Sequence, residues 1–138
     1  MAVLARTPAV AIEQRLATLS DLPAYEDVRP PESGLVMLRG RIAGAGAPFN
    51  FGEASVSRAA VRLKTGEVGA SYMLGRDAAK ARSAALLDAL WQHAAWRSCI
   101  ERDVVSPLAE ALDKADLRAA TETAGTRVDF FTLVRGED

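Results

Sequence analysis

The sequence predicts an α+β domain, in which helices pack on one face of an antiparallel sheet of four to five strands (a meander plus a C-terminal strand). Three observations lead to this fold class. Strand-like segments cluster between residues 25 and 74, helical segments cluster between residues 78 and 125, and the last regular stretch returns to strand character. Strands that run together, followed by helices that run together, are typical of α+β proteins.

Length and composition limit the possible classes of protein. The 138 residues predict a single domain over residues 1–138, and that length buries a sizeable core. A formal net charge of −1 argues against a general nucleic-acid binder. One cysteine excludes an internal disulfide and fits a reduced cytosol. No membrane-spanning apolar run and no signal-peptide layout is present, so a soluble cytoplasmic protein is expected.

The first third of the chain predicts one helix and two strands. A helix is expected over residues 7–19, with Thr7 as N-cap and Pro8 as its first helical residue. Strands are expected over residues 25–29 and 35–42, separated by the turn sequence PPESG.

Two more strands complete the predicted meander. Residues 49–64 read as extended, with a bend near Gly52, and Gly66 supplies the turn that follows. Residues 68–74 alternate regularly, and their larger apolar side chains are expected to face the core: Val68, Ala70, Tyr72 and Leu74.

Helical periodicity begins after residue 76. Asp77 is a plausible N-cap for a long helix over residues 78–100. Ser106 and Pro107 mark the start of a further helix, which ends near Gly125. The long helix is expected to face the core with Leu87, Leu90, Trp91 and Ala94.

The stretch over residues 126–136 predicts a closing strand. Five of the seven residues from 128 to 134 are β-branched or aromatic, and Gly125 and Gly136 bound the run. Both faces become apolar from residue 130 onward, which is typical of a central strand or of one covered by another chain. Core or interface positions are therefore expected for Phe130, Phe131 and Leu133.

The sequence offers no recognisable catalytic or metal constellation. His93 and Cys99 are the only soft ligands, and six positions on one helix would turn them about 120° apart. Zinc requires three or four converging ligands, and the glycines over residues 40–46 match neither phosphate-loop pattern. No Gly-x-Ser-x-Gly elbow accompanies the single histidine. We therefore predict no metal and no catalytic residue. A catalytic pair of carboxylates that folding brings together stays open, because such a pair leaves no pattern in the sequence.

Basic side chains predict a charged sheet face. If the meander strands are in register, one non-core face carries Arg39, Arg41, Arg58, Arg62 and Lys64. Such a face suits contact with phosphates or with an acidic partner, since the guanidinium fork recognises both. Ordinary solvated salt bridges explain the same pattern, and the two interpretations stay open.

Several motifs resemble one known family. Residues 34–41 (GLVMLRGR), 51–63 (FGEASVSRAAVRL), 69–77 (GASYMLGRD), 85–90 (ALLDAL) and above all 127–136 (RVDFFTLVRG) follow one another in the required order. Together they resemble the G subunit of the bacterial carbon–phosphorus lyase system, the PhnG family. The resemblance spans roughly residues 24–136, most of the chain.

The resemblance implies a function in organophosphonate catabolism. It implies membership of a core complex with the H, I and J subunits, chiefly in contact with the I subunit, and with the L subunit needed for the reaction. In this family's pathway ATP loses adenine to a phosphonate, which yields α-D-ribose 1-methylphosphonate 5-triphosphate. The I subunit is regarded as the nucleosidase-like catalyst, and the J subunit later cleaves the carbon–phosphorus bond by radical chemistry. No cofactor is implied for this chain, because ATP is a substrate of the whole complex.

The leading hypothesis is an accessory subunit that has no catalytic residue of its own. Two alternatives stay open: a subunit that contributes arginines to phosphate or nucleotide binding, and a free-standing homo-oligomeric ligand-binding domain. The candidate ligand- or partner-binding residues lie inside the matching motifs and are Arg58, Arg62, Arg76 and Arg135.

Overall fold

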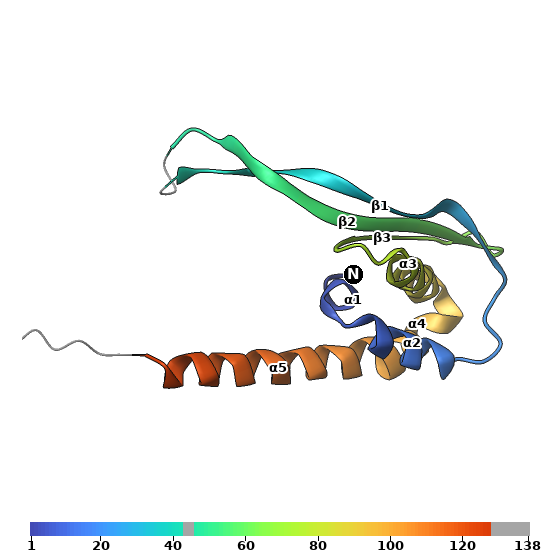
Figure 1. Ribbon diagram of the computed structural model, residues 1–138. Coiled ribbons are helices and arrows are strands. Elements are labelled where there is room, and N and C mark those ends of the chain that lie inside the picture. Colours follow the sequence, from blue (N-terminus) through green and yellow to red (C-terminus); the bar gives the residue numbers. More distant parts are fainter. Residues whose placement is uncertain (43–45, 128–138) are drawn as a thin grey trace, which may run out of the picture.

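The computed structural model describes residues 1–42 and 46–127 and has an α+β architecture, which confirms the predicted fold class (Figure 1). In chain order the elements are α1 (Ala2–Arg6), α2 (Ala9–Ala17), β1 (Tyr25–Gly40), β2 (Phe49–Leu63), β3 (Val68–Leu74), α3 (Ala78–Gln92), α4 (Ala94–Ile100), the π-helix η2 (Glu101–Val105) and α5 (Ser106–Gly125).

The sheet is antiparallel, in the order β1-β2-β3. Residues 1–42 and 46–127 contain these three strands, so the prediction of four to five strands is not confirmed. The predicted closing strand lies outside the described residues from position 128 onward, and Thr126 caps the end of α5.

The two short strands predicted around the PPESG sequence form one continuous strand, so the predicted turn is wrong. β1 runs through Pro30 and Pro31, and its register against β2 shifts between Asp27 and Arg29 and again between Arg29 and Glu32. Proline is tolerated on an edge strand and at bulges, where its missing N–H removes no ladder hydrogen bond. β1 is such an edge strand, and its bulges absorb both prolines.

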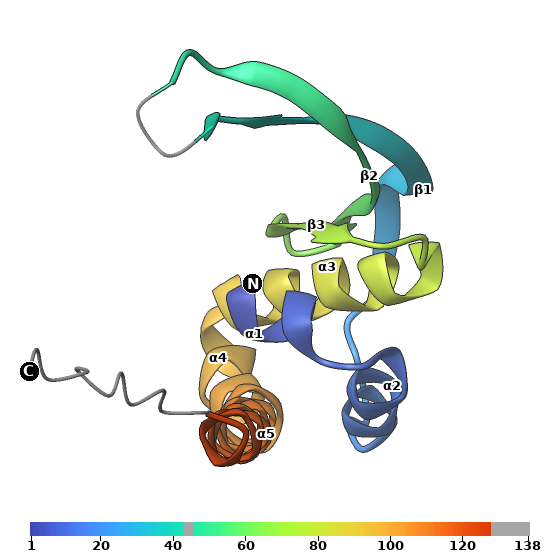
Figure 2. The same ribbon diagram turned by 60° about the vertical axis from the view of Figure 1, so that its left-hand side comes forward.

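Helix α3 covers one face of β2 and β3 at very close range (Figure 2). A Cβ on Gly69 would lie 2.1 Å from the carbonyl oxygen of Ala85 and 2.2 Å from the amide nitrogen of Ala89. The facing side of α3 is built from alanines and leucines that are buried, among them Ala85, Ala89 and Leu90. Small residues on both elements therefore let the helix axis approach the sheet.

The predicted core face of β3 is wrong. Its buried residues are Gly69, Ser71 and Met73, whereas Val68, Ala70, Tyr72 and Leu74 point away from α3 and are exposed. The Ser71 hydroxyl is satisfied in the interior because it donates to the carbonyl oxygen of Ala81 at 2.6 Å. The close approach of α3 at Gly69 decides which face is covered, so hydrophobicity alone misassigns the two faces.

The long predicted helix begins as expected and breaks earlier. The Asp77 carboxylate accepts from the backbone N–H of Lys80 at 2.8 Å, which confirms it as an N-cap. His93 then adopts an extended conformation and its Nδ1 accepts from the N–H of Ala95, which starts α4. The break changes the core stripe: Leu87 and Leu90 are buried as predicted, whereas Trp91 and Ala94 are exposed.

The N-terminus forms two short helices instead of one. Thr7 is the C-cap of α1 and Pro8 is the N-cap of α2, so the predicted helix start at Thr7 is wrong. Leu4 of α1 and Ile12 of α2 are buried in the core. The helix start predicted at Ser106 and Pro107 is confirmed by α5, although α4 and η2 lead into it without a loop.

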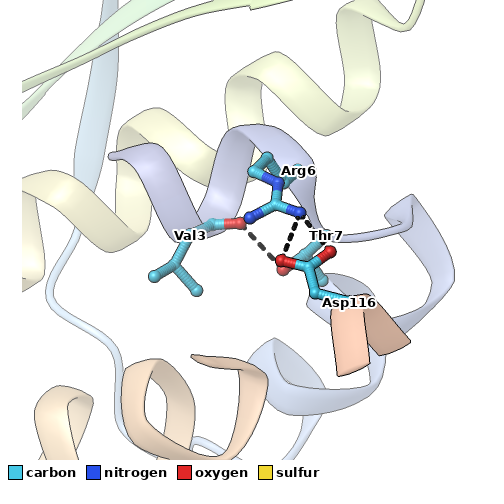
Figure 3. A network of polar contacts seen from close by, with 4 residues as sticks. All are labelled: Val3, Arg6, Thr7 and Asp116. Atoms are coloured by element: carbon cyan, nitrogen blue, oxygen red, sulfur yellow. Dashed lines mark hydrogen bonds and ion pairs between the residues drawn. The ribbon is translucent and has the colours of Figure 1, made fainter. Parts of the chain in front are cut away.

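The guanidinium of Arg6 links the N-terminal helix α1 to the middle of α5 (Figure 3). It donates to both carboxylate oxygens of Asp116 at 2.7 and 2.9 Å, and this pair links α1 to α5. Beyond Asp116 every described residue of α5 is exposed. In Figure 1 this half of α5 and the far end of the β1–β2 hairpin project to the same side of the molecule.

Candidate functional site

His93 and Cys99 serve local structure at the two ends of one short helix. The break at His93 ends α3, and His93 caps α4, whose last turn contains Cys99. The thiol of Cys99 donates to Oδ2 of Asp103 at 3.3 Å. Among residues 1–42 and 46–127 no cluster of three or more His, Cys, Asp or Glu side chains has a metal-binding arrangement. The absence of a metal stays a prediction for the whole chain.

Cys99 is one of the residues that line a polar surface pocket of about 570 Å³, together with Arg102 and Asp103. Arg102 donates two hydrogen bonds to Asp103, at 2.6 and 2.7 Å, and these lower the pKa of Asp103 to about 2. The bond from Cys99 to this carboxylate raises the pKa of the thiol. A thiolate is the nucleophilic form of cysteine, so this arrangement holds Cys99 in its unreactive form.

A second pocket, of about 300 Å³, lies between α1, α3 and η2. Trp91 lines it, with its indole N–H donating to Glu101 at 2.7 Å and the Arg97 guanidinium 4.5 Å from the ring centroid. The helical pattern predicts Trp91 in the core, because it gives no sign of the break at His93. This break brings α4 and η2 back across the end of α3, where Trp91 lines the pocket.

The outer face of the sheet holds two of the predicted basic residues in cross-strand ion pairs. Nε of Arg58 lies 2.7 Å from Glu32, and Nη1 of Arg62 lies 3.4 Å from Glu26. Both arginines are exposed, as predicted, and each pairs with a carboxylate directly opposite on β1. The outer face is therefore charge-compensated, which favours the interpretation as ordinary surface salt bridges.

The register does not extend this face to Arg39. Cross-strand partners point to the same side of a sheet, and alternate residues of one strand share a face. Glu32 pairs with Arg58, but the register shifts between Leu38 and Arg39, and Arg39 lies opposite Asn50. That all five basic residues project together therefore stays a prediction.

The hairpin beyond the third strand, residues 35–42 and 46–55, is termed the arm, and the rest of the molecule apart from the distal half of α5 is termed the body. β3 pairs with β2 only over residues 56–62, so the arm has two strands. Val36 and Leu38 are half-buried, and the other large apolar side chains of its described residues are exposed: Leu35, Met37, Ile42, Phe49 and Phe51. The Phe51 ring lies over Gly40, 3.0 Å from where a Cβ would be.

One face of the arm continues the buried face of the body. Ser33 and Ser57 form a cross-strand pair with their hydroxyl oxygens 2.8 Å apart, and Ser57 is fully buried. Leu35 and Met37 follow Ser33 at alternate positions of β1, so they belong to the same face. Leu35 is nevertheless 65% exposed and Met37 55%.

Arg76 lies at the base of the arm. It follows Gly75, whose φ of +104° makes the turn into α3, and it lines a hollow of about 270 Å³ with Leu35. Ser57 donates to the carbonyl oxygen of Gly75 at 2.9 Å, which fixes this turn against the sheet. The structure thus brings Arg76 next to the arm and away from Arg62, at the other end of the paired strands.

The remaining predicted site residues lie beyond the described part of the chain: Phe130, Phe131, Leu133 and Arg135. Their proposed roles stay predictions. None of the helices in the described ranges has the length and apolar character needed to span a bilayer.

The fold and surface define a class: a small α+β protein with a helix-covered body and an apolar arm that its own described residues leave uncovered. Comparison with known proteins narrows the class. The family model described as "Phosphonate metabolism protein PhnG" matches residues 1–136. The chain therefore belongs to the PhnG family, which confirms the resemblance found in the motifs.

A curated relative from Rhizobium meliloti (strain 1021) is similar over the whole chain. It is the alpha-D-ribose 1-methylphosphonate 5-triphosphate synthase subunit PhnG, and it is 54% identical over 138 residues. The alignment covers all of this chain and 88% of the relative.

Proposed function

We propose that this chain is an accessory subunit of the carbon–phosphorus lyase core complex. It is needed for the ATP-dependent formation of alpha-D-ribose 1-methylphosphonate 5-triphosphate in organophosphonate catabolism. The observation that carries the proposal is the 54% identity, across the full chain, to a subunit of the synthase that makes this compound.

The exposed surface supports a role within an assembly. Monomeric proteins rarely leave large contiguous apolar patches open to water, and such patches mark interaction sites. The arm exposes Leu35, Met37 and Phe51, and the outer sheet face exposes Tyr72 and Leu74. These surfaces suit a subunit that is covered by its partners.

The partners proposed from the family are the H, I and J subunits, chiefly the I subunit, with the L subunit taking part in the reaction. The complex is placed in the cytoplasm, and ATP is its substrate. We assign this chain no cofactor and no catalytic residue, and we place the chemistry in the neighbouring subunits.

Reconstitution of the synthase with and without this chain tests the proposal. The expected result is phosphonate-dependent release of adenine from ATP when all subunits are present, and its loss when this chain alone is omitted. Full activity without the chain would contradict the proposal, and so would turnover of ATP by the purified chain alone.

The ion pairs bear on the alternative in which arginines bind phosphates. Arg58 and Arg62 would have to leave Glu32 and Glu26 before meeting an anion. We therefore expect the complexes that carry Arg58→Ala or Arg62→Ala to assemble and to keep their turnover. Loss of turnover in an intact assembly would instead favour the nucleotide-binding role.

A further inference from the structure

The arm is the part of the described chain where apolar exposure and unpaired positive charge coincide. Leu35, Met37 and Phe51 are exposed there, with Arg39 on the same strand as the first two. Interfaces between proteins are enriched in Met, aromatic residues and Arg, and depleted in Lys, Glu, Asp, Ser and Ala. The arm presents the enriched types at Met37, Phe51 and Arg39, beside one depleted charged residue, Glu53. Its enriched side chains suit a protein interface.

The arm also lacks what stabilises the same sheet in the body. The face that carries Leu35 and Met37 is continuous with the face covered by α3 at Ser57, but α3 does not reach the arm (Figure 2). A two-stranded ribbon without a covering layer is marginally stable in water. A layer supplied by another polypeptide would extend the cover that α3 provides over the body.

Charge separates the arm from the other exposed apolar surface. On the outer sheet face, Arg58 and Arg62 are paired with Glu32 and Glu26. Within residues 1–42 and 46–127, by contrast, no ion pair is formed by Arg39, Arg41 or Arg76. Arg41 donates to the carbonyl oxygen of Gly46, at 3.2 Å.

We propose that the arm, together with Arg76 at its base, docks into an apolar groove of another subunit of the synthase, and that carboxylates border that groove. Leu35 and Met37 are the apolar anchors, and Arg39, Arg41 and Arg76 meet the acidic border. The inference rests on the proposed function, since it names the surface by which this subunit joins the assembly.

The test measures binding of the full-length chain to the co-purified remaining subunits of the synthase. Met37→Asp replaces an apolar anchor with a carboxylate opposite Glu53, its cross-strand neighbour. We expect it to weaken binding at least about 30-fold, as loss of an interface hot spot does. Val10→Asp is the matched control, because Val10 is 59% exposed on α2, which lies at the opposite end of the molecule from the arm (Figure 1). It is expected to bind as wild type does, and unchanged urea midpoints exclude misfolding of either variant.

A second pair of variants tests the acidic border. The combined change Arg39→Glu and Arg41→Glu is expected to slow association and to flatten its dependence on salt, because rim charges act mainly on the encounter rate. Lys64→Glu is the control, since Lys64 is exposed at the opposite end of the sheet. Unchanged salt dependence in the double variant would overturn the acidic border.

The outcomes separate this inference from the proposed function. If the wild-type chain binds the other subunits and Met37→Asp binds equally well, the arm is not the docking surface, and the proposed function stands. If the wild-type chain does not bind the other subunits, the result contradicts both the docking inference and the proposed function. Dimerisation of the isolated chain through the arm, or binding of a short uridine oligonucleotide that depends on Arg39 and Arg41 while assembly does not, would also overturn the inference.

Discussion

In β2, residues 57, 59, 61 and 63 are buried beneath helices, whereas residues 49–53 of the same strand are exposed. Both regions pair with β1 in antiparallel register, and each contains a shift in that register. What differs is the neighbour: the body has β3 and α3, and the arm has neither. Strand pattern therefore specifies which residues share a face, while burial depends on what packs against that face.

The first way to sharpen this comparison is to add one methyl group to a glycine in each region. Gly69→Ala would place a Cβ 2.1 Å from a backbone oxygen of α3. This clash is relieved only if the whole helix shifts away from the sheet. We expect a loss of about 4 kcal/mol in the free energy of unfolding, measured by urea denaturation. Gly52→Ala is the control in the arm, where nothing lies within 4 Å of the added carbon. A similar loss in both variants would contradict the division between body and arm.

The second test truncates one leucine in each region. Leu90 is 0% exposed under the sheet, so Leu90→Ala should cost about 3 kcal/mol of unfolding free energy. Leu35→Ala in the arm should change that free energy by less than about 0.5 kcal/mol in the isolated chain. A large destabilisation by Leu35→Ala would mean that the arm is covered by this chain itself.

The third test concerns the cap that aligns α3 with the sheet. Asp77→Ala removes the acceptor for the backbone N–H of Lys80, and we expect it to cost about 1 kcal/mol in the same denaturation measurement. Asp77→Ser retains a capping oxygen and should restore most of the loss. Equal destabilisation by both substitutions would show that the cap contributes little.

The smallest expected effect is the acid dependence at Asp103. Its pKa is about 2 in the folded chain and 3.8 without the surrounding structure, so its ionised form favours folding. That contribution is complete above the higher value and disappears as pH falls through the folded value. The difference in unfolding free energy between wild type and Asp103→Asn should therefore shrink between about pH 4 and pH 2.

The thiol of Cys99 gives an independent readout of the same group. Removal of the Asp103 carboxylate lowers the raised pKa of Cys99, so alkylation of Asp103→Asn should be faster than that of wild type at mildly alkaline pH. Equal alkylation rates would contradict the hydrogen bond between Cys99 and Asp103.

The sequence predicts which types of residue are exposed at the candidate site, but not which residues the fold brings together there. Exposure of Arg58 and Arg62 follows from strand alternation, but their pairing with Glu32 and Glu26 depends on register, which the two bulges in β1 alter. The exposed apolar arm was not predictable, because hydrophobicity along a strand does not show which of its residues lack a covering layer. Only the length of β3, which stops opposite Val56, shows that Leu35 and Met37 lie beyond the helix-covered body.

By itself the sequence determined the α+β class, the family, most of the strand residues of the meander and the cap at Asp77. These features depend on local backbone preferences and on residues close together in the chain. The tertiary structure alone decided which face of β3 is buried, where the long helix breaks and which apolar residues stay open. The physical reason is close packing: at Gly69 the space left by α3 admits no side chain, and this contact decides which face of the strand the helix covers.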